Sequence, residues 1–293
     1  MINNQELLEE LTRLTNLKIL IETYEEIAAN RMRKNRSVVL ASRLFNEGLG
    51  TMYQRIKSSY KSQILTIMQR KRIASQNVLT MIKRNGKTVS LLISSNAGLY
   101  GDIVPKISEQ FILFTQKTPC DIGIIGRLGR RLFEERNSNK QYTFFDFPDV
   151  DADPLEVEKL ATFLIQYEKI YIFYGKFISV GVQQPTMLDV VGEEKDEKEE
   201  AASKDSQIKY LFEPSLEQVM MFFEQQIFTS LIEQTVKEAE LAKFASRMIT
   251  LDSATENVKT ALKAVQNQQR VLIHRKANKK QQELLTGISL WNK

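Results

Sequence analysis

The sequence predicts an α/β domain inserted between two long helices, which lie at the N- and C-terminal ends of the chain and form an antiparallel coiled coil. Three observations carry this prediction. Residues that break helices cluster in the middle of the chain, apolar residues recur at helical spacing on both sides of it, and the middle alternates between strand-like and helix-like segments. With 293 residues, 42% hydrophobic and 26% charged, the chain has an ordinary globular composition and a length of about two domains.

The first stretch, residues 1–84, is predicted to be the N-terminal helix of the coiled coil. The first proline is Pro105, and before Gly86 the only glycines are Gly48 and Gly50, so a break is expected at most near 48–50. Apolar residues follow one another at steps of three and four, and such a helix needs a partner helix. The predicted seam is Leu7, Leu11, Leu14, Leu17, Ile21, Tyr24, Ala28, Met32 and Val39.

The last stretch, residues 210–293, is predicted to be the partner helix. It contains no Gly or Pro between Ser215 and Thr286, and at 1.5 Å per residue that run extends about 105 Å. Pro214, Ser215 and Gln218 form a proline-led capping box at its start. A seven-residue repeat then predicts a coiled-coil seam. The repeat consists of Phe244, Leu251, Val258, Val265 and Leu272, interleaved with Met248, Thr255 and Leu262.

The middle, residues 85–191, is predicted to be a Rossmann-like α/β domain with a mostly parallel sheet, which argues against the alternative of an all-helical bundle. The predicted strands are 88–94, 121–125, 142–145 and 170–174, with further strand-type sequence at 177–182 and 187–191 at a sheet edge. The predicted helices are 103–114, 128–136 and 155–168, the last opened by Asp153 and Pro154. Residues 192–209 form a charged segment that predicts a flexible loop, acidic over 193–200.

The patterns that resemble ligand sites all fail on inspection. Met81 stands where a phosphate loop before Lys87 needs its first glycine, and the glycines at 123, 126 and 129 are wrongly spaced for a dinucleotide site, so a tight turn explains them. Asp149, Asp151 and Asp153 alternate as in a calcium loop but are followed by Pro154, so helix capping and the helix dipole explain them.

The sequence also has few residues in patterns suited to catalysis, and we expect no catalytic, cofactor-binding or metal site in this chain. A single cysteine, Cys120, and a single histidine, His274, exclude a disulfide framework and a Cys/His metal cage. No leader-like segment and no apolar run of membrane-spanning length is present, so a cytoplasmic location is expected.

Charge is concentrated in the two predicted helices. Residues 31–87 hold 14 Lys or Arg and one acid, and residues 257–293 hold eight and one acid. Basic helices could follow nucleic-acid phosphates, which makes a basic coiled-coil nucleic-acid-binding protein one hypothesis. Because the helices lack interleaved aromatic residues and carry apolar seams, we favour a protein partner with an acidic surface and expect no nucleic acid. The chain ends on an apolar segment that suggests insertion into a protein socket.

Six segments, in order along some 250 residues, carry a family resemblance. In the first helix AANRMRK (28–34) is similar to Ala-Ala-Ser-Lys-Leu/Met-Arg-Lys, and in the middle SSNAGLYG (94–101) is similar to Ser-Ser-Asp-Arg-Gly-Leu-Cys-Gly. GRLGRRLF (126–133) and YIFYGKFIS (171–179) match two further segments. YLFEPS (210–215) and ASRMITLDSAT (245–255) match the opening and course of the last helix. On these segments the chain resembles the gamma subunit of F-type ATP synthase, the rotating central shaft.

The resemblance implies a non-catalytic rotor that couples rotation to ATP synthesis or hydrolysis inside a hexameric ring of alpha and beta subunits. ATP, ADP and Mg would be bound by those partners, and the α/β domain would meet an epsilon-type subunit and the membrane c-ring. The complex would lie peripherally on the inner face of a bacterial plasma membrane, in the cytoplasm, and serve ion or proton transport. The implied contacts with the ring are Arg31, Arg33, Lys34, Arg270, Leu284, Leu285, Ile288 and Trp291. The implied contacts of the base are Asn96, Gly98, Leu99, Tyr100 and Gly101.

Several positions depart from the family pattern. Asn96 and Ala97 replace an Asp and an Arg, Tyr100 and Asp102 replace a Cys and a Gly, and Val271 replaces a Gln. These departures support an alternative hypothesis, a gamma-like shaft from a divergent or duplicated F-type-like ATPase that drives something other than ion translocation.

Overall fold

The structure is a computed structural model that describes residues 4–60, 63–64, 84–137, 140–190 and 212–291. It divides into two compact units, one of Met1–Ala29 with Arg247–Lys293 and the other of Asn30–Ser246. Each unit is described by itself. The predicted boundaries at 84/85, 191/192 and 209/210 border residues outside the described part of the chain and stay predictions.

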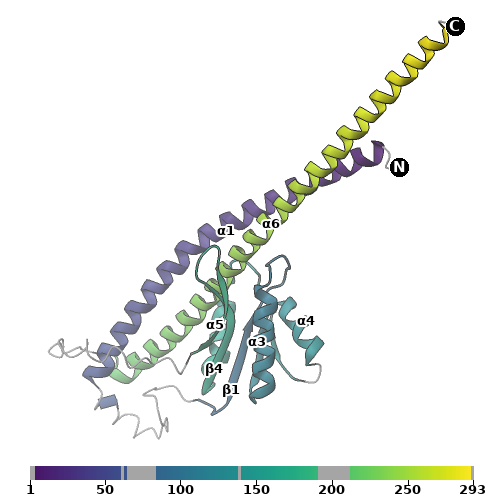
Figure 1. Ribbon diagram of the computed structural model, residues 1–293. Coiled ribbons are helices and arrows are strands. Elements are labelled where there is room, and N and C mark those ends of the chain that lie inside the picture. The colour runs from purple at the N-terminus through teal and green to yellow at the C-terminus, as the bar shows by residue number, and fades with distance from the viewer. Residues whose placement is uncertain (1–3, 61–62, 65–83, 138–139, 191–211, 292–293) are drawn as a thin grey trace. The chain divides into compact units, whose positions relative to one another are not determined.

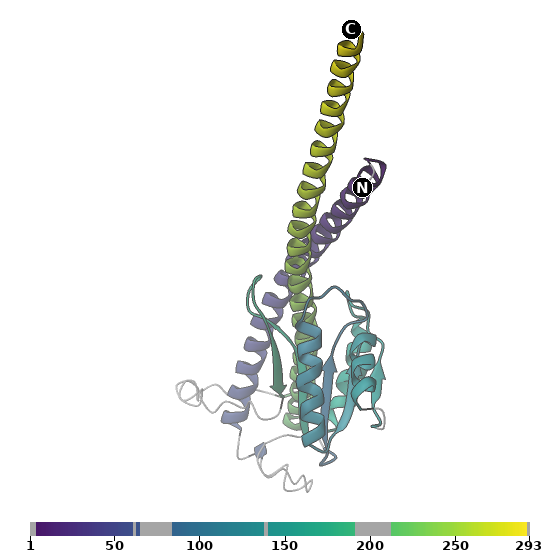
Figure 2. The same ribbon diagram turned by 45° about the vertical axis from the view of Figure 1, so that its right-hand side comes forward.

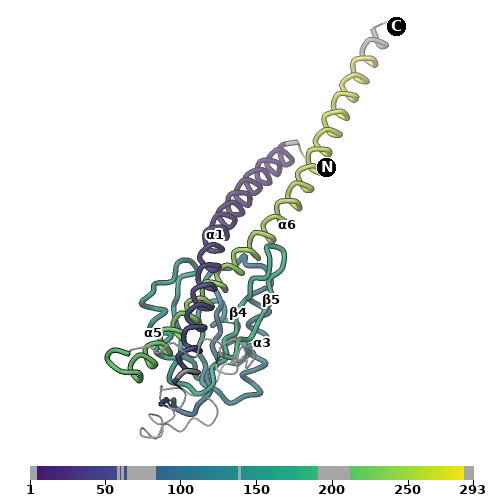
Figure 3. The backbone as a smooth tube through the Cα atoms, turned by 90° about the vertical axis from the view of Figure 1, so that its left-hand side faces the viewer, coloured from purple at the N-terminus to yellow at the C-terminus, as the bar shows by residue number. Residues whose placement is uncertain are grey.

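The two predicted long helices are present. Helix α1 spans Asn4–Ser59 and runs through Gly48 and Gly50, and helix α6 spans Leu216–Trp291. The predicted start of α6 is confirmed, because the Gln218 backbone N–H donates to the Ser215 hydroxyl at 3.3 Å. Figures 1 and 3 show α1 beside α6.

In the unit of Asn30–Ser246, polar contacts give the direction of this pairing. Arg43 Nη2 lies 2.7 Å from Glu238 Oε1, and further along α1 the Tyr53 hydroxyl donates to Glu224 Oε1 at 2.9 Å. Later residues of α1 therefore meet earlier residues of α6, which confirms the antiparallel arrangement.

In the other unit the helices pack through an apolar seam. Ile21 of α1 is buried with Leu251 and Val258 of α6, and Leu14, Ala254 and Leu262 pack against them. Within this unit α6 continues past the beginning of α1 (Figure 2). The prediction that Leu17 and Tyr24 belong to the seam is wrong, because both side chains are exposed. Leu7, Ile21 and Ala28 are buried and Leu14 is half-buried, which gives a heptad line on α1. The steps of three from Leu14 to Leu17 and from Ile21 to Tyr24 leave this line.

The middle of the chain forms a five-stranded sheet of order β3-β2-β1-β4-β5. The strands are β1 (Thr88–Ile93), β2 (Asp121–Ile125), β3 (Thr143–Phe145), β4 (Lys169–Phe177) and β5 (Gln183–Asp189). The first four strands are parallel, and β5 pairs antiparallel with β4 at the edge, with Phe177 opposite Gln183. The predicted strand over 177–182 is wrong beyond Phe177, because residues 178–182 form the hairpin turn, where Val182 N–H donates to Ser179 O.

Three shorter helices connect the parallel strands: α3 (Ile103–Lys117), α4 (Arg127–Arg136) and α5 (Pro154–Ile165). Asp153 is the N-cap of α5, as predicted, and its Oδ1 accepts from Leu155 N–H at 3.0 Å. Helix α5 ends at Ile165, three residues before its predicted end.

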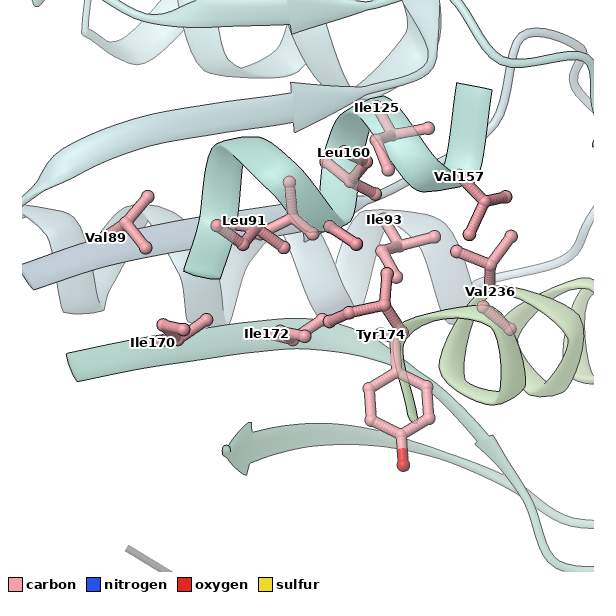
Figure 4. Close-up of a cluster of buried hydrophobic side chains, with 14 of the residues drawn as sticks. Val89, Leu91, Ile93, Ile125, Val157, Leu160, Ile170, Ile172, Tyr174 and Val236 are labelled. Atoms are coloured by element: carbon pink, nitrogen blue, oxygen red, sulfur yellow. The ribbon is translucent and has the colours of Figure 1, made fainter. Parts of the chain in front are cut away.

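The sheet is covered on both faces, as its central apolar strands require. On one face Leu92 of β1 and Phe173 of β4 are buried with Phe111 of α3 and Phe133 of α4. On the other face β1, β2, β4, α5 and α6 contribute to the apolar cluster shown in Figure 4. Its labelled residues are Val89, Leu91, Ile93, Ile125, Val157, Leu160, Ile170, Ile172, Tyr174 and Val236. Helix α6 therefore completes the core of the α/β domain. In the described part of the chain no helix combines the length and apolarity that a membrane crossing requires.

Candidate functional site

The candidate site lies at the carboxyl edge of the sheet. After β1 the chain builds β2 and β3 on one side, and it then crosses to place β4 on the other side of β1. In open α/β sheets the crevice at such a reversal is where ligands bind. Here the β1–α3 loop (residues 94–102), the segment before α5 (146–153) and α6 residues 240–246 meet at this edge.

Asp149 binds the β1–α3 loop through two backbone N–H groups. Its Oδ1 accepts from Asn96 N–H and its Oδ2 from Ala97 N–H, both at 2.8 Å. The side chain of Asn96 extends the network, since its Nδ2 donates to Phe147 O at 2.6 Å and its Oδ1 accepts from the Arg127 N–H at the start of α4 at 2.9 Å. Asn96 and Asp149 thus link the β1–α3 loop, the segment before α5 and the start of α4.

Lys243 brings α6 into this network. Its ammonium donates to Ser94 O at 3.0 Å, lies 3.5 Å from Asp149 Oδ1 and stands 5.8 Å from the centroid of the Tyr100 ring. The side chains of Lys243 and Asp149 are only 10% and 13% exposed, so the pair is shielded from water far more than a surface salt bridge. One turn further, the Ser246 hydroxyl donates to Tyr100 O at 2.8 Å.

Gly126 explains why the turn between β2 and α4 fits beside this loop. Its φ is +92°, and a Cβ there would lie 2.7 Å from Ser95 N. Leu128 N–H then donates to Ser95 O at 2.8 Å. The interpretation of the 123–129 glycines as serving a tight strand-to-helix turn is confirmed at Gly126.

Asp151 connects the same segment to α1. Its Oδ2 lies 3.3 Å from Arg31 Nη1 and 3.6 Å from Lys34 Nζ, and its backbone N–H donates to Glu240 Oε1 of α6 at 3.4 Å. Asp151 has φ +50°, a conformation that Asp tolerates better than most residues. Burial raises the pKa of the Glu240 carboxyl above its ordinary value.

The three alternating aspartates therefore have three different partners. Asp149 binds the β1–α3 loop and α6, Asp151 pairs with α1, and Asp153 caps α5. The interpretation of all three as capping residues is right only for Asp153. In the described residues no group of three or more His, Cys, Asp or Glu side chains could hold a metal ion. Cys120 is a free thiol whose pKa is raised by burial, which disfavours the thiolate.

The structure also locates the residues implied as contacts with a ring. Arg31 and Lys34 face Asp151, and Arg33 Nη2 donates to Asn30 Oδ1 at 2.5 Å. Arg270, Leu284 and Leu285 are exposed on α6. Ile288 and Trp291 lie in α6, but their side chains fall outside the described part of the structure. The contact roles of all these residues stay predictions.

Of the residues implied as base contacts, Asn96 and Tyr100 point into the protein, where Tyr100 packs against Phe244. Gly98, Leu99 and Gly101 are exposed, and Leu99 adopts φ +65°. Their contact roles likewise stay predictions. Sequence reasoning missed Lys243, Glu240 and Ser246. The signal available was a lysine within a run of small and apolar residues, Leu241–Ala245, on a predicted helix.

Two long antiparallel helices that carry an inserted α/β domain define a protein of the helical-stalk class. Comparison with known proteins agrees. A family model described as ATP synthase matches residues 3–282. The chain belongs to the ATP synthase gamma chain family. It is the central-stalk subunit of an F-type ATP synthase and a non-catalytic part of that complex.

The curated relatives are also ATP synthase gamma chains, although their sequence identity to this chain is low. The ATP synthase gamma chain of Pelotomaculum thermopropionicum is 21% identical, with 86% of each chain covered. That of Buchnera aphidicola subsp. Acyrthosiphon pisum is 22% identical, with 91% of this chain and 90% of the relative covered. Among solved structures, a chain of the Tetrahymena thermophila mitochondrial ATP synthase, from its central stalk and c-ring, matches in fold. Its TM-score is 0.58 at 14% identity, covering 80% of this chain and 99% of that one.

Proposed function

We propose that this chain is the rotating shaft of a complex in which one copy stands inside a ring of alternating alpha and beta subunits. The observation that supports this best is the family match over residues 3–282, which takes in helix α1, the α/β domain and most of helix α6. ATP, ADP and Mg would be bound by the ring subunits. An epsilon-type subunit and a membrane c-ring would meet the α/β domain, which would place the complex on the inner face of the plasma membrane.

Leu284 and Leu285, near the end of α6, are the residues that we assign to the ring. Leu284 and Leu285 are 59% and 67% exposed. Neighbouring apolar side chains that are exposed in this way are typical of a surface that a protein partner covers. The surrounding basic residues, among them Arg270, Arg275 and Lys276, would face an acidic surface.

Co-expression with the cognate alpha and beta chains tests the assignment. We expect one complex with a single copy of this chain per ring, measured by native mass spectrometry. Replacing Leu284 and Leu285 together by Ala should lower the yield of complex and the coupling of ATP hydrolysis to rotation. The matched control is Lys279→Ala with Glu283→Ala, an exposed pair on the same segment whose Nζ and Oε1 are 3.9 Å apart, and this change should leave the complex intact.

Two outcomes would count against the proposal. One is recovery of the chain only in free form. The other is an equal effect of the apolar and the control substitutions, which would remove α6 residues 284–285 from the ring contact. Purification from membranes with mild detergent separates the two kinds of shaft. Co-purification of a c-ring supports an ion-translocating rotor, and its absence from an otherwise complete complex supports a shaft that drives another process.

A further inference from the structure

At the carboxyl edge of the sheet, the contacts around the Asp149 side chain have the form of an anion site. The N–H groups of two successive residues, Asn96 and Ala97, point at one position, and successive backbone N–H groups of this kind form anion-binding concavities. The ammonium of Lys243 lies on the same position from α6. Two oriented donors and one shielded positive charge therefore converge there.

The position is filled by a carboxylate of the chain itself. Each oxygen of Asp149 accepts one of the two N–H groups at 2.8 Å, and Oδ1 also faces the Lys243 ammonium at 3.5 Å. The carboxylate thus makes the contacts that two oxygens of a bound carboxylate or phosphate would make. Since the aspartate comes from the segment before α5 and the lysine from α6, the filled site holds both to the β1–α3 loop.

An ordinary ion pair between Asp149 and Lys243 would show similar contacts, but it predicts a different result when the two charges are exchanged. In an ion pair the two charges can be exchanged, because each side chain needs only its partner. In a filled anion site they cannot be exchanged, since the backbone N–H groups of Asn96 and Ala97 are fixed donors and need an acceptor.

We infer that this α/β domain contains an anion-binding site that is occupied by its own Asp149 side chain, which through Lys243 fixes α6 to the sheet. The chemical class that the site accepts is a small carboxylate or an inorganic oxyanion. In the native chain the site is closed to both. Removing the Asp149 carboxylate opens it.

The test is thermal unfolding of the full chain with Asp149→Ala, in sodium formate and in sodium chloride at equal ionic strength. Formate replaces the deleted carboxylate group. In chloride the variant should melt about 5–10 °C below the native chain. In formate at least half of this loss should be regained, with saturation as the formate concentration rises. The native chain should show no difference between the two salts. If the variant does not fold in chloride, its refolding yield in each salt replaces the melting temperature.

Three further variants complete the test. Asp146→Ala removes an exposed carboxylate of the same segment, paired with Arg127 at 2.9 Å, and should not respond to formate. Lys243→Met leaves Asp149 in place, so its loss should be smaller and independent of formate. The exchange of Asp149→Lys with Lys243→Asp should remain as unstable as Asp149→Ala. Recovery of native stability by the exchange, or a formate effect on Asp149→Ala no larger than on the native chain, would overturn the inference.

Discussion

The α/β domain and the paired long helices are stabilised in different ways. The domain buries large side chains completely, among them Leu91, Phe111 and Leu160, on both faces of a sheet. The helix pair buries a narrow seam, in which the small Ala28 and the polar Asn35 and Thr255 stand among the apolar residues. A core packed from many directions makes each large residue costly to remove. A seam distributes the same task over many turns, so single contacts contribute less.

A matched pair of leucine truncations should give the largest effect and tests this contrast directly. Leu91→Ala in the domain core should reduce the free energy of unfolding by about 3–5 kcal/mol, because neighbours on several sides cannot close the cavity. Leu251→Ala in the helix seam should reduce it by about 2 kcal/mol, since the seam can relax toward solvent. Urea unfolding followed by circular dichroism measures both. Equal losses would show that the seam is packed as rigidly as the core.

A matched pair of glycine substitutions sharpens the comparison and should have opposite signs. Gly126→Ala should destabilise the chain by about 3 kcal/mol, because φ is +92° and the added Cβ would lie 2.7 Å from Ser95 N. Gly48→Ala in α1 meets nothing within 4 Å and should stabilise the chain by about 0.5–1 kcal/mol. The melting temperatures of the two variants provide the measurement. Destabilisation by Gly48→Ala would indicate that the helix needs flexibility there.

The smallest expected effect concerns pH at the place where domain and helix meet. Burial raises the pKa of Glu240 above its ordinary 4.5, so between that value and the raised one the folded state holds a proton that the unfolded state has released. Stability contributed by the neutral carboxyl is thus complete below 4.5 and is lost as the pH rises through the raised pKa. Glu240→Gln should remove this loss, so the native chain should weaken relative to the variant with rising pH. Parallel pH profiles of the two chains would contradict the assignment.

Much of the fold can be predicted from the sequence, because many of its elements depend on patterns among neighbouring residues. The alternation of strand-type and helix-type segments, the cap at Asp153 and the start of α6 at Ser215 depend on neighbours along the chain, and they were predicted correctly. The errors arise where spacing is ambiguous. Steps of three and four both look helical, so the spacing predicts Leu17 and Tyr24 in the seam, whereas the structure leaves both side chains exposed.

The junction at the sheet edge could not be predicted in the same way. Asp149 and Lys243 are 94 residues apart in sequence, and nothing in the local sequence of either one names the other. The aspartates looked like helix caps because capping is the local function of Asp before a proline-led helix. Only the three-dimensional crossing of the strands brings the β1–α3 loop, the segment before α5 and α6 to one edge.

The alternation of aspartates at 149, 151 and 153 has a consequence for the tolerance of this segment to length changes. Each aspartate points to a different helix, so inserting or deleting one residue would shift the spacing and deprive α6, α1 and α5 of their partners together. In the contacts described, the hairpin turn at 178–182 forms hydrogen bonds only within the hairpin. We therefore expect it to accept added residues. The length of the segment from Asp149 to Asp153 is therefore fixed, and adding or removing a residue there is incompatible with assembly of the fold.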